Sequence, residues 1–258
     1  MQSKKNTDLF LKKVNDSQSG LIEIQDYSIA YFICKAEDKS KTINEDSLFV
    51  SSTKEKIRLG VADGAGGHPL GAEASFEICD ELRAVSMDSC LKQIEVANER
   101  VRNLKVGARS TLAFGEIEND KIRFFTVGDS EILYWNSKGT EIYSSLPQSV
   151  AGYKVEIGLT TQSESLDEPL RNEVSTLVGD EFLNIISTTS FDLKKGHSLL
   201  IGTDGLFDNL SHCEIRDIIY AEKFLDSIEM LNEICLKKDP SRWKKDDDIA
   251  YLFLTKNY

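Results

Sequence analysis

The sequence predicts an α+β protein in which two packed, mainly antiparallel sheets are covered by helices. Three observations support this fold class. Short apolar segments of strand character are separated by turn residues, helical periodicity is confined to two regions, and strand and helix do not alternate strictly. A doubly wound sheet would require that alternation.

The chain is expected to form one domain, because its 258 residues contain no internal repeat and no linker rich in Pro, Gly or Ser. Residues 1–20 are polar and are interpreted as an N-terminal tail, and residues 21–258 as the domain itself. Within the domain, residues 146–196 are the least regular. This irregularity favours a flap or insertion beside a site over ordinary edge structure.

Strand character is concentrated in short apolar runs that Gly, Asn and Asp separate. The runs cover residues 27–34, 46–52, 56–63, 110–118, 121–129, 131–135, 197–204 and 248–254. The sequence GEIENDKI, residues 115–122, predicts an antiparallel hairpin.

Helical periodicity is strongest between Pro69 and Leu104. It predicts a helical hairpin with a break near Ser86. A second helical region begins at Ser211, where Ser211 and Glu214 have the spacing of a capping box, and a further helix is expected over residues 227–237.

The composition excludes several classes of function. With 31 basic and 43 acidic side chains the net charge is −12, which repels nucleic acid and anionic membranes alike. The five cysteines are odd in number and widely spaced, so no disulfide framework is expected. Because no signal peptide or membrane span is apparent either, we expect a cytoplasmic protein.

Acidic residues stand where apolar strands meet loops. Asp63, Asp129 and Asp204 end such strands, Asp46 begins one, and Asp247 immediately precedes the last. Each alone is best interpreted as a turn residue. If the strand ends share one rim, however, the carboxylates must be neutralised by protons or cations.

Oxygen ligands without His or Cys favour Mg²⁺ or Mn²⁺ over zinc. The histidines, His68, His197 and His212, have no zinc-binding spacing, and the absence of a GxSxG motif disfavours a serine hydrolase. A dinucleotide loop over residues 59–75 is also disfavoured, because Asp63 would face the pyrophosphate. The glycines there suit a metal site better, in which the carbonyl of Gly64 turns inward as a ligand.

Six short motifs follow one another in an order and spacing that resemble a known family, the metal-dependent protein serine/threonine phosphatases of the 2C type (PPM family), in particular its bacterial members. The motifs are NEDS (44–47), VADGAGG (61–67), GARSTL (107–112), VGDS (127–130), TDGLFDNLS (203–211) and DDDIA (246–250). The resemblance covers nearly the whole chain, and it implies a four-layer αββα sandwich.

The resemblance also implies roles for individual residues. Asp63 is similar to the carboxylate that bridges two metals, and the carbonyl of Gly64 is similar to a ligand of one of them. Asp204 and Asp247 resemble the ligands of the other metal. Asp63, Asp204 and Asp247 are therefore the expected catalytic residues.

Three further acidic residues complete the expected metal site. By the same resemblance, Glu45 and Asp46 would hold metal-coordinated waters, and Asp129 would help to bind a third, weaker metal. The cofactors implied are two Mn²⁺ or Mg²⁺ ions, with a third at Asp129. The implied reaction is hydrolysis of phosphoserine or phosphothreonine in a protein partner, the substrate of a cognate kinase, by a water that bridges the two metals.

Several positions depart from the family pattern. Lys41 stands where an Arg often binds the substrate phosphate, and it would supply only a point charge there. Ala65 stands where a His is a candidate general acid, for which His68 would be a poor substitute. Glu131 replaces an Arg and Ala250 a Thr.

These departures leave two alternatives open, a catalytically weakened member that binds phosphoproteins and a phosphomonoesterase of small molecules. Lys244 and Lys245, just before the triple Asp, are interpreted as surface charge balance.

Overall fold

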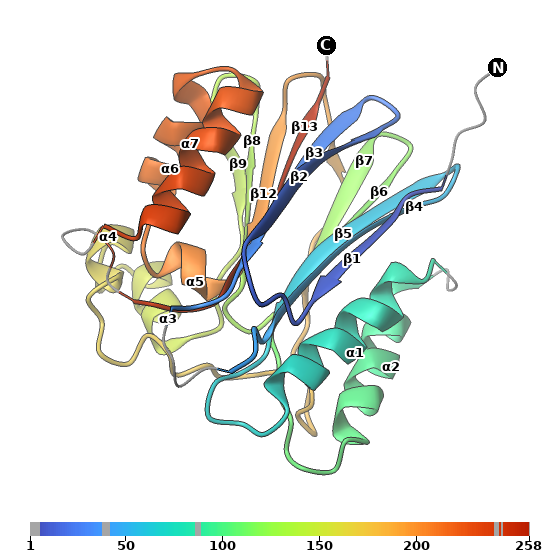
Figure 1. Ribbon diagram of the computed structural model, residues 1–258, viewed down its shortest axis with the longest axis vertical. Helices are drawn as coiled ribbons and strands as arrows, with labels where there is room; N and C mark the ends of the chain where they lie inside the picture. The colour runs from blue at the N-terminus through green and yellow to red at the C-terminus, as the bar shows by residue number, and fades with distance from the viewer. Residues whose placement is uncertain (1–5, 38–41, 86–88, 240–242, 244, 258) are drawn as a thin grey trace.

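The computed structural model describes residues 6–37, 42–85, 89–239, 243 and 245–257. Two sheets pack face to face, and a pair of helices covers the outer face of each, which gives four layers (Figure 1). The predicted α+β sandwich is therefore confirmed. In the described part of the chain, no helix is both long and apolar enough to cross a bilayer.

The first sheet is antiparallel and carries the N-terminal strand at its edge. Its order is β1 (Asp8–Lys12), β4 (Asp46–Ser52), β5 (Lys56–Asp63), β6 (Leu112–Glu118), β7 (Lys121–Val127) and β10 (Ile186–Ser187), and β11 (Phe191–Asp192) also pairs with β7. Strand β4 is buried along its whole length. Its central residues Leu48, Phe49 and Val50 are apolar, as expected for a strand with both faces covered.

The second sheet is also antiparallel and has the C-terminal strand in its interior. Its order is β2 (Gln18–Ile24), β3 (Tyr27–Cys34), β13 (Ile249–Lys256), β12 (Ser198–Gly202), β8 (Glu131–Trp135) and β9 (Glu141–Ser144). Chain ends that are far apart in the sequence thus meet in one sheet.

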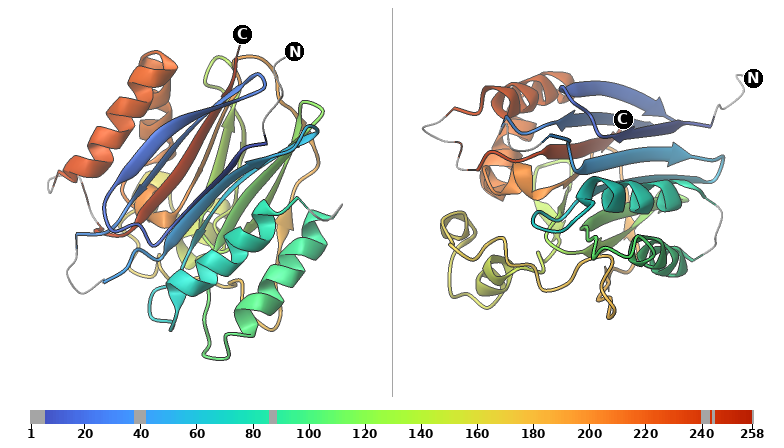
Figure 2. Two further views of the ribbon diagram at one scale, coloured as in Figure 1. Left: turned by 45° about the vertical axis from the view of Figure 1, so that its right-hand side comes forward. Right: turned by 60° about the horizontal axis from the view of Figure 1, so that its bottom comes forward.

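Helices α1 (Gly71–Arg83) and α2 (Cys90–Arg102) cover the first sheet, and α6 (His212–Ala221) and α7 (Phe224–Lys237) cover the second (Figure 2). Three apolar cores fill the spaces between the four layers. Short helices lie at one end of the sandwich, on the left of Figure 1 below α6 and α7. They are α3 (Val150–Glu156), α4 (Gln162–Ser165) and α5 (Asp204–Phe207).

Most predicted elements are present in the structure. All eight predicted strand segments contain strands, and the helical hairpin is formed by α1 and α2, although its expected break at Ser86 lies outside the described residues. The capping box of Ser211 and Glu214 is confirmed, and α7 begins at Phe224, three residues before the predicted start at 227.

The prediction of a polar tail over residues 1–20 is wrong from residue 8 onwards. Residues Asp8–Lys12 form β1, and β2 begins at Gln18. Both are edge strands, and Leu9 and Leu11 of β1 pack against the core between the sheets. A half-buried edge strand needs few apolar residues, which is why its sequence resembles a tail.

Arg58 of β5 is fully buried beneath α1 and α2. Its Nε donates to Glu116 Oε2 on β6 at 2.7 Å, and its guanidinium also donates to Gln93 Oε1 of α2 at 2.8 Å and to the carbonyl of Leu82 in α1 at 3.3 Å. One cation thus joins the first sheet to both helices that cover it.

A second polar contact joins the other sheet to its helices. His212 Nε2 at the start of α6 lies 2.8 Å from Glu131 Oε2 at the start of β8. Burial alone would lower the pKa of His212, but the Glu131 carboxylate outweighs it and the pKa is raised.

We expect Arg58→Ala to lower the free energy of unfolding by about 3–5 kcal/mol, because Glu116 would be left buried without its main partner. Urea denaturation measures this loss. Arg216→Ala is the control, since Arg216 pairs with Asp217 at the surface and should change stability little. Equal, small effects in both variants would contradict this role for Arg58.

We expect the stabilisation from the His212–Glu131 pair to depend on pH. The pKa of His212 is higher in the folded state than in the unfolded state. The stabilisation is therefore fully present below the unfolded-state pKa of about 6.5, and it is lost as the pH rises through the folded-state pKa. The difference in stability between wild type and Glu131→Gln, measured by thermal unfolding, should therefore be larger at about pH 6 than at about pH 9. A difference that does not vary with pH would show that the ion pair contributes nothing.

Candidate functional site

The predicted acidic residues meet at the end of the sandwich where α5 lies. Asp46 and Asp63 are direct partners across β4 and β5, Asp204 opens α5 after β12, and Asp247 lies two residues before β13. A cavity of about 580 Å³ opens among them. Its lining includes Asp63, Gly64, Ala65, His68, Thr111, Asp129, Asn172, Asp204, Lys245 and Asp247.

Asp63 is held by the backbone and side chain of Thr111. The Asp63 N–H donates to Thr111 Oγ1 at 3.0 Å, and the Thr111 N–H donates to the Asp63 carbonyl at 2.8 Å. Thr111 Oγ1 in turn lies 2.6 Å from Ser130 Oγ. This supporting role is not apparent from the sequence, because Thr is a common residue inside strands.

Gly64 lies where two backbone segments approach closely. A Cβ on Gly64 would lie 2.3 Å from the carbonyl carbon of Gly71, and a Cβ on Gly71 would lie 2.6 Å from Glu45 Oε1. The Gly64 N–H donates to the Glu45 carbonyl at 3.2 Å. A side chain at Gly64 would therefore collide with the backbone of Gly71, whereas one at Gly71 would displace the carboxylate end of Glu45.

Asp46 is buried next to Asp63 on the neighbouring strand, but it is not among the residues that line the cavity. Its Oδ2 accepts a hydrogen bond from Thr203 Oγ1 at 2.8 Å, whereas its Oδ1 is buried and has no hydrogen-bond partner. A buried acceptor without a donor is costly in a folded protein. This unpaired oxygen therefore marks a place where a cation or a bound water would stabilise the site.

Asp248 connects two loops of the site. Its Oδ2 accepts from the backbone N–H of Glu45 at 2.8 Å, and its Oδ1 accepts from that of Ala36 at 2.7 Å. Because Asp248 is adjacent to Asp247, these hydrogen bonds hold the DDDIA motif (246–250) close to the NEDS motif (44–47). The sequence offered Asp248 only as one of three consecutive aspartates.

The acidic side chains raise one another's pKa values. Burial, and then the charge of Asp204, raises the pKa of Asp63 and of Asp129, while burial followed by the charge of Asp248 raises that of Asp46. For Asp208, burial and the nearby Asp204 raise the pKa to about 6. The site thus carries more negative charge than its surroundings neutralise.

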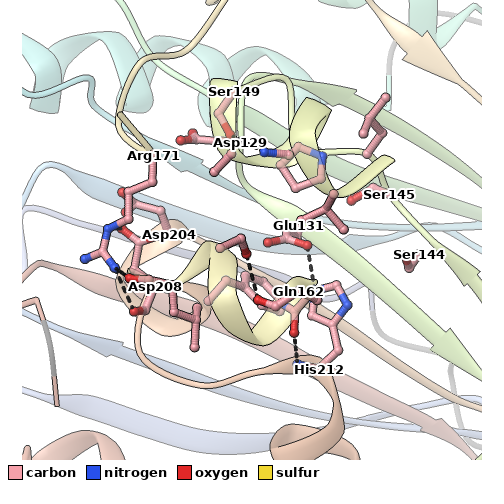
Figure 3. A pocket seen from close by; sticks show the side chains of 18 of the residues that line it. Asp129, Glu131, Ser144, Ser145, Ser149, Gln162, Arg171, Asp204, Asp208 and His212 are labelled. Carbon is pink, nitrogen blue, oxygen red and sulfur yellow. Dashed lines mark hydrogen bonds and ion pairs between the residues drawn. The ribbon is translucent and has the colours of Figure 1, made fainter. Parts of the chain in front are cut away.

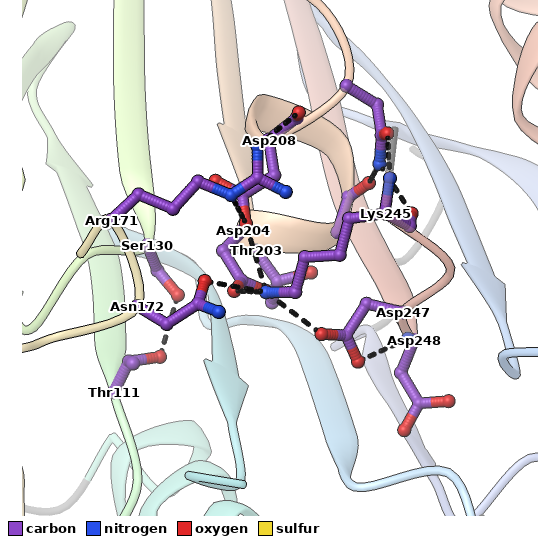
Figure 4. Close-up of polar contacts among 12 residues, drawn as sticks. Thr111, Ser130, Arg171, Asn172, Thr203, Asp204, Asp208, Lys245, Asp247 and Asp248 are labelled. Atoms are coloured by element: carbon purple, nitrogen blue, oxygen red, sulfur yellow. Dashed lines mark hydrogen bonds and ion pairs between the residues drawn. The ribbon is translucent and has the colours of Figure 1, made fainter. Parts of the chain in front are cut away.

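Lys245 supplies positive charge at the centre of this group (Figure 4). Its Nζ lies 2.9 Å from Asp208 Oδ2 and 3.0 Å from Asp247 Oδ2, and it also contacts Asp204 Oδ2. Burial would lower the pKa of Lys245, but these carboxylates outweigh it and raise the pKa. The interpretation of Lys245 as surface charge balance is therefore wrong, and Lys244 lies outside the described residues.

The carboxylates are not drawn together around a single point. Over the residues that the structure describes, no three His, Cys, Asp or Glu side chains converge closely enough to hold an ion as they stand. Instead, Asp204 and Asp247 each contact the ammonium of Lys245.

A second cavity of about 260 Å³ adjoins the first and shares Asp129 and Asp204 with it (Figure 3). Residues of α3, α4 and the loops around them form one side of it, and the Glu131–His212 pair forms another. Arg171 Nε lies 3.4 Å from Asp208 Oδ2 at its rim. The irregular segment 146–196 therefore borders the site.

The remaining predicted residues have different outcomes. Ala65 and His68 line the larger cavity, as the order of motifs suggested. His197 is elsewhere, with Nδ1 2.6 Å from the hydroxyl of Tyr134. Lys41, the predicted phosphate ligand, lies outside the described residues.

Comparison with known sequences identifies phosphatases. No family model matches the chain. It is 26% identical over 181 residues to protein phosphatase PhpP of Streptococcus pneumoniae, covering 63% of this chain and 72% of that one. It is also 26% identical over 231 residues to the mitochondrial protein phosphatase 2C homolog 7 of Saccharomyces cerevisiae, covering 76% of this chain and 64% of that one.

Solved structures share the fold. The serine/threonine phosphatase Stp1 of Staphylococcus aureus superposes with a TM-score of 0.73 at 20% identity, covering 95% of this chain and 96% of that one. RsbX in complex with magnesium superposes with a TM-score of 0.62 at 20% identity, covering 92% and 99%. The chain is thus similar in sequence to named protein phosphatases, one of them a protein phosphatase 2C homolog, and it shares its fold with a solved serine/threonine phosphatase.

Proposed function

We propose that this protein hydrolyses the phosphate esters of phosphoserine and phosphothreonine in proteins, with Mn²⁺ or Mg²⁺ as the cofactor. One observation carries the proposal. A single cavity is lined by Asp63, Gly64, Asp129, Asp204 and Asp247, which come from distant stretches of the chain. Hard oxygen donors in this number are what Mg²⁺ and Mn²⁺ prefer.

The proposed ligands of two divalent cations are Asp63, the carbonyl of Gly64, Asp204 and Asp247. Glu45 and Asp46 would hold coordinated waters, and Asp129 would help to bind a third ion. The buried, unpaired Oδ1 of Asp46 and the tight backbone contact at Gly64 support this arrangement. When bound, the cations supply an activated water and neutralise charge on the phosphoryl group.

Other residues of the chain hold the proposed metal ligands in place. Thr111 fixes the backbone of Asp63, Thr203 holds Asp46, and Asp248 fastens the loop of Glu45. These hydrogen bonds keep the carboxylates in place despite their mutual repulsion. Without cations, the same acidic rim would repel a dianionic phosphate ester.

The partner that fits this proposal is a phosphorylated protein, the product of a cognate kinase. The relatives named as protein phosphatases support a protein substrate. Segment 146–196 is proposed as a flap over which the polypeptide around the phosphorylated residue would lie, because α3 and α4 form part of the smaller cavity beside the acidic site.

We expect phosphate release from a phosphothreonine peptide to require added Mn²⁺ or Mg²⁺. Release should stop in EDTA and return when excess metal is added, because the carboxylates alone cannot activate water. A malachite-green assay measures the released phosphate. Turnover that persists in chelator would contradict the proposal.

We expect Asp63→Asn and Asp204→Asn each to lower kcat by about a hundred-fold or more, because each removes a negative oxygen ligand. Asp192→Asn is the matched control, since Asp192 is exposed on β11 and pairs weakly with Lys121. Its activity should equal that of wild type. Circular dichroism checks that all three variants fold.

Two further measurements separate the alternative functions. Metal and phosphopeptide binding by calorimetry without phosphate release would identify a binding member of the family. Faster hydrolysis of sugar phosphates than of phosphopeptides would identify a phosphomonoesterase of small molecules.

A further inference from the structure

The ammonium of Lys245 occupies the space between the carboxylates that the proposed function assigns to a metal. Nζ contacts Asp204 Oδ2 and lies 3.0 Å from Asp247 Oδ2, and both aspartates are proposed ligands of one ion. Asp208 Oδ2 is a third neighbour, at 2.9 Å. Lys245 is part of the loop before β13, only two residues from Asp247.

A divalent ion and this ammonium cannot use the same oxygens together. An ion bound to both carboxylates would lie about 2.0–2.6 Å from each oxygen. Nζ already lies 3.0 Å from Asp247 Oδ2 and contacts Asp204 Oδ2. The two cations would then be separated by a few ångströms in a partly buried site, where like charges repel strongly.

We propose that Lys245 is a resident cation that competes with the divalent metal for Asp204 and Asp247, and that metal binding displaces its side chain. This inference rests on the proposed metal-dependent function. In the metal-free protein the lysine neutralises the acidic cluster. On metal binding it leaves, so the affinity for the ion is lower than the carboxylates alone would give.

Displacement of Lys245 also changes a contact with the segment beside the site. Nζ lies 3.4 Å from Asn172 Oδ1, and Asn172 lines the same cavity (Figure 4). Loss of Lys245 from the cluster would leave Arg171 as a cation at Asp208, at 3.4 Å. Metal occupancy is thereby linked to the contacts of residues 171 and 172.

The first test measures metal affinity directly. Isothermal titration of Mn²⁺ into the full-length protein should show binding about tenfold or more tighter for Lys245→Met than for wild type, because Met is an unbranched side chain of similar size without the charge. Lys238→Met is the control. Lys238 pairs with Asp246 in the same acidic loop, so its loss changes net charge equally without opening the site. The affinity of the Lys238→Met variant for Mn²⁺ should stay within about twofold of the wild-type affinity.

A second readout uses stability. In chelator, Lys245→Met should melt at a lower temperature than wild type, because the carboxylates lose their internal cation. In saturating Mn²⁺ the two proteins should melt at similar temperatures. An unchanged melting temperature in chelator would count against the proposal.

A third measurement uses the wild-type protein alone and therefore does not depend on the folding of any variant. Acetylation of lysines by an amine-reactive reagent, followed by mass spectrometry, should label Lys245 faster in saturating Mn²⁺ than in chelator. Lys238 should be labelled at the same rate in both. Labelling of Lys245 that does not respond to Mn²⁺ would overturn the inference.

The outcomes distinguish this inference from the function on which it rests. If wild type binds Mn²⁺ and releases phosphate, but Lys245→Met binds no tighter, the inference is wrong and the proposed function stands. If neither protein binds Mn²⁺, both are wrong.

Discussion

Repulsion among buried carboxylates is the constraint on which this structure depends. Asp46, Asp63, Asp129 and Asp204 meet at one end of the sandwich, and burial together with their neighbours' charges raises the pKa of the first three. A folded chain keeps such a group only if cations or protons compensate it. The site is therefore a place that attracts positive charge, from within the chain or from solution.

Hydrogen bonds within the polypeptide hold these carboxylates, and they do not require a bound cation. Thr111 fixes Asp63 and Thr203 fixes Asp46, while Asp248 joins two loops through backbone N–H groups. Two sheets with three apolar cores provide the rigid frame behind them. Stability elsewhere in the fold offsets the unfavourable electrostatics of the site, as is common for functional sites.

Much of this arrangement could be predicted from the sequence, because continuous apolar runs define buried strands and the aspartates stand at their ends. Strand β1 was missed, since it is a short edge strand in which no side chain is fully buried. The position of Lys245 was missed for a different reason. A lysine beside three aspartates is usually a solvated charge, and only the fold brings it to Asp204 and Asp208, 41 and 37 residues away in the chain.

The two cavities have a common wall formed by Asp129 and Asp204. The affinity of any small molecule that binds in the smaller cavity would depend on the charge around those two side chains. If divalent ions bind as proposed, thermodynamic linkage requires the affinity of that molecule to vary with their concentration, and the affinity of the ions to vary with the concentration of the molecule. Inhibitors selected for the smaller cavity would consequently differ in potency between ion-rich and ion-poor conditions.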